Sequence, residues 1–247
     1  MNNNTYIRIQ FIYVIFVSMS NDCERCIIKK FTGLQTLSSE ELKCISDGKT
    51  TKSFKKGEII FDEGEHLKGI YCVRHGIAKL SKLSTNGKDQ IIKFVSNGEV
   101  LGQRSVIAEE ATNLRAVAVN DMNSCFIPKK IILDNLHKNT DFSIEMLHNL
   151  AHELREADDV IVNISQKSVK QRIAETLLHL EESFGVDNKG FMVIQLSRED
   201  ISNIVGTATE SCIRMLSELK KEQLIATSGK KIQITDAATM KKLAGGV

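Results

Sequence analysis

Residues 197–221 read SREDISNIVGTATESCIRMLSELKK, two short helical patterns on either side of a glycine. The first begins at Ser197, which Asp200 follows three residues later in the arrangement of a capping box. Gly206 then supplies a turn, and Thr207–Glu210 repeats the capping signature before a second helix. Two short helices joined by a glycine turn predict a helix-turn-helix.

The second helix of this motif has two distinct faces when it is counted at about 100° per residue. The predicted core face holds Ala208, Cys212, Met215, Leu216 and Leu219. The predicted outward face holds Thr209, Glu210, Ile213, Arg214, Ser217, Lys220 and Lys221. A guanidinium on this face can donate hydrogen bonds to guanine O6 and N7, and a carboxylate can accept one from cytosine N4. The first N–H groups of the helix can bind a phosphate. The alternative is purely structural: Glu210 caps Thr207 and pairs with Arg214, which stabilises the helix by ~0.2–0.5 kcal/mol.

The rest of the C-terminal third has the order of a winged helix-turn-helix. A helix is expected over 169–184, a short apolar segment over 192–196, and a hairpin over 224–234 around Ser228 and Gly229. Lysines are paired at 220–221, 230–231 and 241–242, but paired charges are usual on solvated surfaces. We expect a DNA-binding domain over 168–247.

Short β-branched and aromatic runs, separated by glycines, characterise residues 50–127. From Gly57 to Gly98 successive glycines are 7, 12, 11 and 11 residues apart, a spacing typical of several short strands. This pattern predicts a β-barrel or jelly roll that can hold a small-molecule effector at one end. We expect this sensing domain to cover 23–137.

A long stretch without glycine or proline begins at Asp141 and predicts a helix at 138–167 with its hinge. Apolar residues recur at Leu147, Ala151, Leu154, Ile161 and Ile164, in steps typical of a coiled-coil seam, with Asp158 at the interrupted position. The stripe either packs on its own barrel or forms the seam of a symmetric dimer. We favour the dimer, because a compact barrel has little surface long enough to cover the stripe.

Composition restricts the class of protein without deciding its partner. The 33 basic and 31 acidic side chains give a net charge of +2, so affinity for a polyanion depends on local arrangement. The apolar run at 7–17 is too short to span a membrane, and six scattered cysteines suggest a reducing compartment, so the cytoplasm is expected and no membrane partner. Met19 is a plausible alternative start to Met1, and 1–22 is expected to be a disordered extension.

Three regions together resemble the CRP/FNR family of bacterial transcription regulators. They are Gly206-Thr-Ala-Thr-Glu-Ser-Cys-Ile-Arg-Met-Leu216, Lys56-Gly-Glu-Ile-Ile-Phe-Asp-Glu-Gly64 and Tyr71-Cys-Val-Arg-His-Gly76. The resemblance implies an α+β fold: an N-terminal double-stranded β-helix (a jelly roll like the cyclic nucleotide-binding domain), a long dimerisation helix and a C-terminal winged helix-turn-helix. It also implies a homodimer that binds palindromic double-stranded DNA, with RNA polymerase as a further partner.

The resemblance assigns DNA contacts to the second helix of the motif. Glu210 and Arg214 match the family's base-reading residues, and Thr209 and Ile213 occupy its variable specificity positions. Ile213 matches neither the Ser of the FNR branch nor the Gly of the CRP branch, so neither branch supplies the operator. The full predicted set is Thr209, Glu210, Ser211, Ile213, Arg214, Ser217 and Lys221.

The effector pocket expected from the resemblance departs from the cyclic AMP pattern. The family's phosphate cassette falls on Gly102, Gln103, Arg104 and Ser105 and on Thr112 or Asn113. The ribose-binding Glu is replaced by Gln103, and the phosphate-binding Arg by an uncharged residue. Arg115 could replace it only if it shares a strand face with Asn113. Cyclic AMP is therefore not the expected effector.

The oxygen-sensing branch of the family binds a [4Fe–4S] cluster through four cysteines. Cys23, Cys26 and Cys125 match three of them, but the position of the third ligand in the chain is Thr32. A cluster therefore requires Cys44 or another group to substitute, and the alternative is that these are plain thiols. Cys72 and Cys212 are expected in the core.

We expect a DNA-binding transcription regulator under the control of an effector or a redox signal. The alternative is a ligand-binding regulatory module that acts through protein contacts without binding DNA. An enzyme is not expected, because none of the six histidines lies at a diagnostic spacing from Cys or Ser and the chain has no glycine-rich nucleotide loop.

Overall fold

The computed structural model describes residues 33–84 and 87–245. The expectations for 1–22, Cys23, Cys26 and Thr32 lie outside the described residues. The chain forms two compact units. One runs to Leu83 and resumes over Ile92–Glu153; the other combines Ser84–Ile91 with the chain from Leu154 onward.

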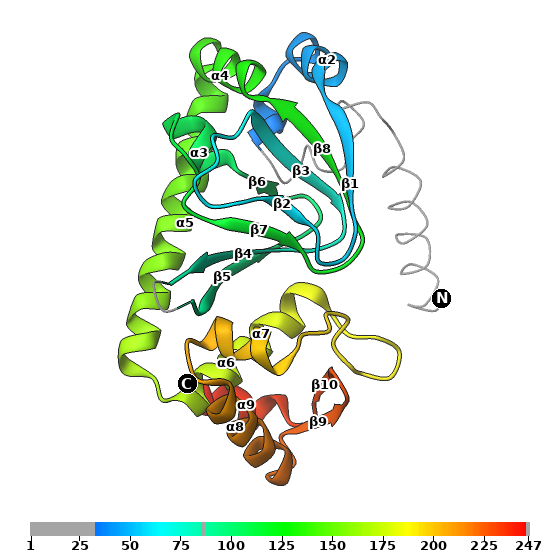
Figure 1. Ribbon diagram of the computed structural model, residues 1–247, viewed down its shortest axis with the longest axis vertical. Coiled ribbons are helices and arrows are strands. Elements are labelled where there is room, and N and C mark those ends of the chain that lie inside the picture. The colour runs from blue at the N-terminus through cyan, green and yellow to red at the C-terminus, as the bar shows by residue number, and fades with distance from the viewer. Residues whose placement is uncertain (1–32, 85–86, 246–247) are drawn as a thin grey trace, which may run out of the picture. The chain divides into compact units, whose positions relative to one another are not determined.

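The jelly roll predicted from the glycine spacing is present in the first part of the chain (Figure 1). Its described strands form two four-stranded sheets, with the orders β1-β8-β3-β6 and β2-β7-β4-β5. The strands are β1 (Thr50–Phe54), β2 (Ile59–Phe61), β3 (Gly69–His75), β4 (Ala78–Leu83), β5 (Asp89–Val95), β6 (Val100–Leu101), β7 (Arg115–Ala118) and β8 (Met122–Pro128).

The inner faces of the two sheets enclose one hydrophobic core. Val73 of β3, Ala116 of β7 and Met122 of β8 are buried in it. Gly76 makes the tight turn after β3 with φ of 102°, and a Cβ there would lie 2.7 Å from Cα of Met122. Only glycine fits this turn, because it alone lacks a Cβ and accepts a positive φ without cost.

A second core covers the outer face of the sheet β1-β8-β3-β6. Ile70 and Cys72 of β3 and Cys125 and Ile127 of β8 are buried there. The helices over this face are the 3-10 helix η2 (Gly33–Thr36), α2 (Ser39–Gly48), α4 (Lys129–Lys138) and the first turns of α5 (Thr140–Gln166). The two cores therefore lie on opposite faces of β3 and β8, because successive side chains alternate along a strand.

The long helix α5 leaves its apolar stripe exposed. Phe142, near its start, is buried, whereas Leu147, Leu154 and Ile161 are 63%, 64% and 66% exposed and recur every seven residues. The stripe is therefore exposed among the residues that the structure describes. In the described part of the chain, no helix combines the length and the apolar character that a membrane span requires.

The C-terminal unit has the order predicted for a winged helix-turn-helix. Helix α6 (Val169–Phe184) begins with a capping box between Ser168 and Gln171. Its buried residues, which include Ile173 and Leu177, form the core with residues of the helices that follow. The remaining elements are α7 (Arg198–Val205), α8 (Thr209–Lys221), β9 (Ile225–Ser228), β10 (Lys231–Ile234) and α9 (Ala237–Leu243).

Candidate nucleic-acid interface

Helix α7 is fixed at both ends by the residues that its sequence predicts. Ser197 Oγ accepts from the backbone N–H of Asp200 (2.9 Å), and the Ser197 N–H donates to Asp200 Oδ2 (3.1 Å), which completes the capping box. Gly206 ends the helix in the left-handed conformation at φ of 68°. The turn therefore has the geometry of a helix-turn-helix.

Helix α8 begins one residue later than its sequence pattern predicts. Ala208 is the N-cap, and no side chain caps this helix, so the expectation that Thr207 and Glu210 form a second capping box is wrong. The reason lies in the preceding turn, where the Thr207 N–H donates to Ser202 O (3.1 Å) as part of the end of α7. Ala208 is consequently exposed, contrary to its predicted place on the core face.

The two faces of α8 otherwise agree with the wheel prediction. Cys212, Leu216 and Leu219 are buried. Glu210, Ile213, Arg214, Ser217, Lys220 and Lys221 are exposed, whereas Thr209 and Ser211 are partly buried. One side of the helix thus packs while the other side offers polar groups to the solvent.

Burial sets the chemistry of the Cys212 thiol on the packed side. Loss of hydration raises the pKa of this thiol to about 11, and Arg198 opposes the shift only in part. A thiol with this pKa stays protonated at neutral pH, because the thiolate is disfavoured in apolar surroundings. Cys212 is therefore a packing residue.

Glu210 and Arg214 carry the strongest indication of base recognition. Within the residues that the structure describes, neither side chain has a hydrogen bond or an ion pair, although they are four residues apart on one helix. The purely structural alternative required Glu210 to cap Thr207 and to pair with Arg214. The geometry provides neither interaction, so both groups remain available to base edges.

Two other predicted contact residues use their hydroxyl groups inside the motif. Thr209 Oγ1 lies 3.1 Å from Ser202 Oγ and ties α8 to α7, while Ser217 Oγ donates to Ile213 O (2.8 Å). These bonds position the helix. Ile213, 46% exposed between Glu210 and Arg214, presents an apolar surface that suits a thymine methyl group.

Lysines add positive charge beside this face. Lys220, Lys221 and Lys230 are exposed and make no ion pair with any described residue. Lys231 differs, because its Nζ lies 3.3 Å from Asp187 Oδ2 and 6.0 Å from the centre of the Phe191 ring. The wing turn is held to α7, since Arg198 Nη2 donates to Gly229 O (3.4 Å).

Two of the predicted effector residues lie beside a carboxylate. Gln103 and Arg104, at the start of α3 (Gln103–Ala108), approach Glu153 of α5. Gln103 Nε2 lies 3.0 Å from Glu153 Oε1, and Arg104 Nε lies 3.9 Å from Oε2. Lys93 Nζ of β5 also contacts Oε1 at 3.0 Å. The carboxylate of Glu153 thus lies among donor groups of β5 and of the predicted effector segment at Gly102–Ser105.

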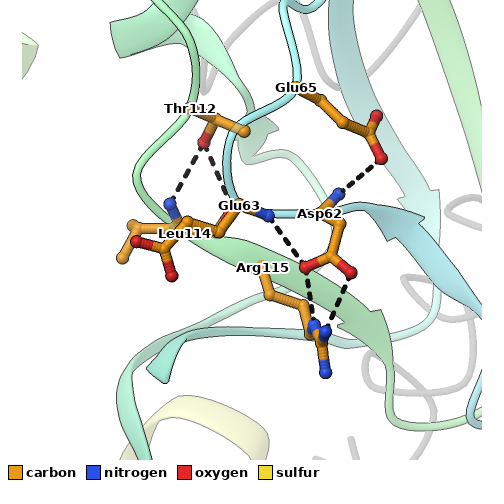
Figure 2. A network of polar contacts seen from close by, with 6 residues as sticks. All are labelled: Asp62, Glu63, Glu65, Thr112, Leu114 and Arg115. Carbon is orange, nitrogen blue, oxygen red and sulfur yellow. Dashed lines mark hydrogen bonds and ion pairs between the residues drawn. The ribbon is translucent and has the colours of Figure 1, made fainter. Parts of the chain in front are cut away.

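Thr112 and Asn113, the other predicted effector residues, carry no charge for a phosphate. Thr112 is buried, and its hydroxyl bonds both backbone groups of Leu114, at 3.2 and 3.3 Å, whereas Asn113 is exposed. Arg115 lies on the outer face of β7 and binds Asp62 through two hydrogen bonds of 2.7 and 2.8 Å (Figure 2). The arginine that could have replaced the phosphate ligand therefore points away from the barrel interior.

The cysteines of the candidate metal site are only partly within the described residues. Cys125 is buried on β8, directly opposite Cys72 of β3. Thiolates are the ligands of iron–sulfur clusters, so Cys125 has the chemistry of one such ligand. Among the described residues no group of three or more His, Cys, Asp or Glu could hold a metal ion, and Cys23 and Cys26 lie outside them.

Two candidate residues were missed by the sequence pattern: Lys93 and Glu153, which are 60 residues apart and have no local signal. Only strand register and helix packing bring these side chains to their partners.

Comparisons with known proteins agree with this architecture. A family model for the cyclic nucleotide-binding domain matches residues 51–139, and one for the Crp-like helix-turn-helix domain matches residues 171–243. The transcriptional activator protein Anr of Pseudomonas protegens is 28% identical over 91% of this chain and 93% of its own length. The fumarate and nitrate reduction regulatory protein of Vibrio cholerae is 26% identical over 90% of each chain.

Solved structures extend the similarity to three dimensions. The structure of FixK2 from Bradyrhizobium japonicum is 26% identical, with a TM-score of 0.72, over 81% of this chain and 98% of that chain. A regulator of the CRP/FNR family from Eubacterium rectale shares the fold with a TM-score of 0.73 at 22% identity, over 86% of this chain and 97% of that one. With both domains matched in order, the chain belongs to the CRP/FNR family and is a DNA-binding transcription regulator.

Proposed function

We propose that this regulator reads a palindromic operator as a homodimer, with α8 of each copy in a major groove. The observation that carries the proposal is that Glu210 and Arg214 are exposed and neither side chain binds any residue that the structure describes. An arginine that binds guanine and a glutamate that binds cytosine together discriminate base pairs, while Lys221 contributes charge without sequence preference. Thr209, Ser211, Ile213 and Ser217 complete the proposed contact surface.

The exposed stripe of α5 supports the proposed dimer. Leu147, Leu154 and Ile161 recur at seven-residue intervals, the period at which two helices keep the same seam in contact. Burial of one such side chain stabilises an interface by about 1.5–3 kcal/mol. A palindromic site requires two recognition helices about one turn of DNA apart, and a symmetric dimer through α5 would supply the two copies that this arrangement needs.

The proposed signal is redox rather than cyclic AMP. Relatives carry names that refer to fumarate and nitrate reduction or to electron transport, which supports a redox input. An iron–sulfur cluster bound by cysteine thiolates would supply electron-transfer chemistry and sensitivity to oxidants. The chain's own contribution is to hold thiol sulfurs in place and to connect the barrel to α5.

Glu153 provides such a connection within the first unit. Its carboxylate joins α5 to Lys93 of β5 and Gln103 of α3. A change in the barrel that moves either partner must therefore change the forces on α5. A small anionic effector would act through the same contacts if it displaced Glu153. We propose RNA polymerase as a later partner and the cytoplasm as the site of action.

Selection of bound duplexes from a random pool tests this function. The full chain should enrich a two-fold symmetric sequence, and enrichment should differ between air and an oxygen-free atmosphere. Affinity should also fall steeply with salt, because phosphate contacts release counterions. A regulatory module that acts through protein contacts alone would enrich no sequence, and that result would contradict the proposal.

A further inference from the structure

One guanidinium joins three helix ends in the C-terminal unit. Arg172 lies near the start of α6, and its guanidinium makes three hydrogen bonds to main-chain carbonyls. Nη1 donates to Ile164 O at 3.1 Å and to Lys167 O at 2.8 Å, where α5 ends. Nε donates to Val205 O at 3.0 Å, where α7 ends. The last turn of the long helix and the first helix of the helix-turn-helix are therefore bound to the same side chain.

The ends of α5 and α7 leave these carbonyls free for a side-chain donor. The last carbonyls of an α-helix have no partner within the helix. The N–H of Ser168, four residues after Ile164, donates to Gln171 Oε1 (2.9 Å) in the capping box of α6, so it does not continue α5. A cation at this place also meets the negative ends of two helix dipoles. Arg172 therefore supplies hydrogen bonds that the backbone gives up where α5 stops and α7 turns.

A second set of contacts restrains the connection between α5 and α6. Only Lys167 and Ser168 separate the two helices. Lys167 Nζ and Asn163 Nδ2 lie 2.8 and 3.3 Å from Glu175 Oε1 of α6. Side chains on both sides of this two-residue connection thus bind one another, and the contacts restrain the angle between α5 and α6.

The contacts of α7 also position α8. Thr209 Oγ1 lies 3.1 Å from Ser202 Oγ, and Val205 precedes Glu210 by five residues. Val205 is 2% exposed, so the carbonyl that Arg172 binds belongs to the packed part of the motif. A chain of contacts therefore runs from the end of α5 through Arg172 and α7 to the exposed face of α8.

We propose that Arg172 is a positioning residue that sets the spacing between the half-sites of the operator. This inference rests on the proposed function, in which α5 forms the dimer seam and α8 reads base edges. Leu154 and Ile161 of the seam lie in the same compact unit as Arg172, so the orientation of α8 on the end of α5 fixes the separation of the two recognition helices. One inserted base pair moves a half-site by about 3.4 Å and turns it by about 35° around the DNA axis, so a fixed orientation selects one spacing. Arg172 acts through α7 and does not itself bind DNA.

Binding of the full chain to duplexes of different spacing tests this role by fluorescence anisotropy. The duplexes are the selected palindrome, the same palindrome with one base pair inserted or removed between its half-sites, and a single half-site. Arg172→Lys keeps the positive charge but not the planar fork that reaches the carbonyls of two helices. Wild type should bind the altered spacings at least about tenfold more weakly than the palindrome, whereas for Arg172→Lys the difference should be less than about threefold. Its affinity for the single half-site should stay within about twofold of wild type, because α8 is unchanged.

Two further variants separate positioning from folding and from charge. Arg172→Gln keeps a planar hydrogen-bond donor without the charge and should also lose the spacing preference. Lys241→Ala removes one exposed positive charge from α9 and should keep the spacing preference of wild type. Circular dichroism and sedimentation velocity establish whether each variant is folded and dimeric.

The outcomes separate this inference from the proposed function. Folded, dimeric Arg172 variants with the wild-type spacing preference, or with equal losses on the half-site and the palindrome, would overturn the role of Arg172. Unfolded or monomeric chains for both Arg172 variants would overturn it too, because the residue would then act on the fold or on assembly. A wild type that binds the palindrome no more tightly than the single half-site would instead overturn operator recognition by a dimer.

Discussion

Arg115 binds Asp62 through two parallel hydrogen bonds, from Nε to Oδ1 at 2.7 Å and from Nη2 to Oδ2 at 2.8 Å (Figure 2). The pair joins the start of β7 to the loop after β2 on the outside of the jelly roll. A bidentate arginine–carboxylate pair is among the stronger polar contacts of proteins and fixes the orientation of the guanidinium. This orientation turns the guanidinium away from the interior of the jelly roll, so Arg115 does not take the place of the phosphate-binding arginine of a cyclic nucleotide-binding domain.

Cyclic AMP should therefore leave the thermal unfolding of the protein unchanged. A chain that bound the nucleotide at 100 times its Kd would gain about 2.7 kcal/mol of stability, which is easily measured as a rise in Tm. We expect no rise, because Thr112 and Asn113 provide no charge for the phosphate and Arg115 is turned outward. A concentration-dependent rise in Tm would contradict this interpretation of the pocket.

The Arg115–Asp62 pair also predicts a pH dependence of stability. Hydrogen bonds from Arg115 hold the pKa of Asp62 below its usual value of 3.8. A carboxyl group with a lowered pKa in the folded state stabilises that state above the unfolded pKa, and this contribution disappears as pH falls through the folded pKa. Asp62→Asn should thus have a lower urea midpoint than wild type at pH 7. In strong acid, where Asp62 is protonated, the two midpoints should become equal. Asp47→Asn, an exposed control, should show little effect at either pH. A difference that widens in acid would contradict the assignment.

The α5 seam predicts a concentration-dependent dimer. Leu154→Asp places a carboxylate in the middle of the stripe, so each copy loses about 1.5–3 kcal/mol of burial and the dimer Kd should rise by about a hundredfold or more. Sedimentation velocity measures this change. Val162→Asp, 49% exposed but rotated about 80° around the helix from Leu154, is the control and should dissociate the dimer less. Equal effects of both variants, or a monomeric wild type, would place the interface elsewhere.

The contacts of Glu153 predict that changes in the barrel alter the affinity of the protein for DNA. Glu153→Gln removes the negative charge shared by Lys93 and Gln103, so the hold of the barrel on α5 should weaken. We expect the DNA affinity of the signal-free protein to change several-fold, measured by fluorescence anisotropy. Asp159→Asn, exposed on the same helix, should leave it unchanged. Identical affinity in wild type and Glu153→Gln would remove Glu153 from the coupling.

Local signals were sufficient for α6, α7 and the β9–β10 hairpin of the C-terminal unit, whereas they gave no prediction for α9. Helix α6 was predicted over 169–184, where the structure places it, because a capping box at Ser168 starts it and Gly185 ends it. The hydrophobic face of α8 followed from its periodicity. The prediction that Thr207 caps α8 was wrong because the backbone N–H of Thr207 donates to Ser202 O at the end of α7.

Long-range pairing could not be inferred in the same way. The register that sets Cys72 against Cys125 depends on which strands become neighbours, and the contact of Lys93 with Glu153 depends on how α5 lies on the barrel. No periodicity within one segment encodes either relationship. Arg115 shows the same limit. The face of β7 expected for its side chain depended on whether Thr112 or Asn113 was aligned with the family's phosphate-binding arginine, and the sequence alone did not decide between them.

Base discrimination by Arg214 tests the central claim most directly. The affinities of wild type and Arg214→Ala are compared on the selected operator, on operators changed at one base pair of each half-site, and on random DNA. Lys221→Ala serves as the control and should weaken binding to all sequences alike. Arg214→Ala should lose about 1–3 kcal/mol per half-site on the operator and become indifferent to the identity of one base pair. Equal losses on operator and random DNA would contradict the assignment of α8 as the helix that reads the sequence.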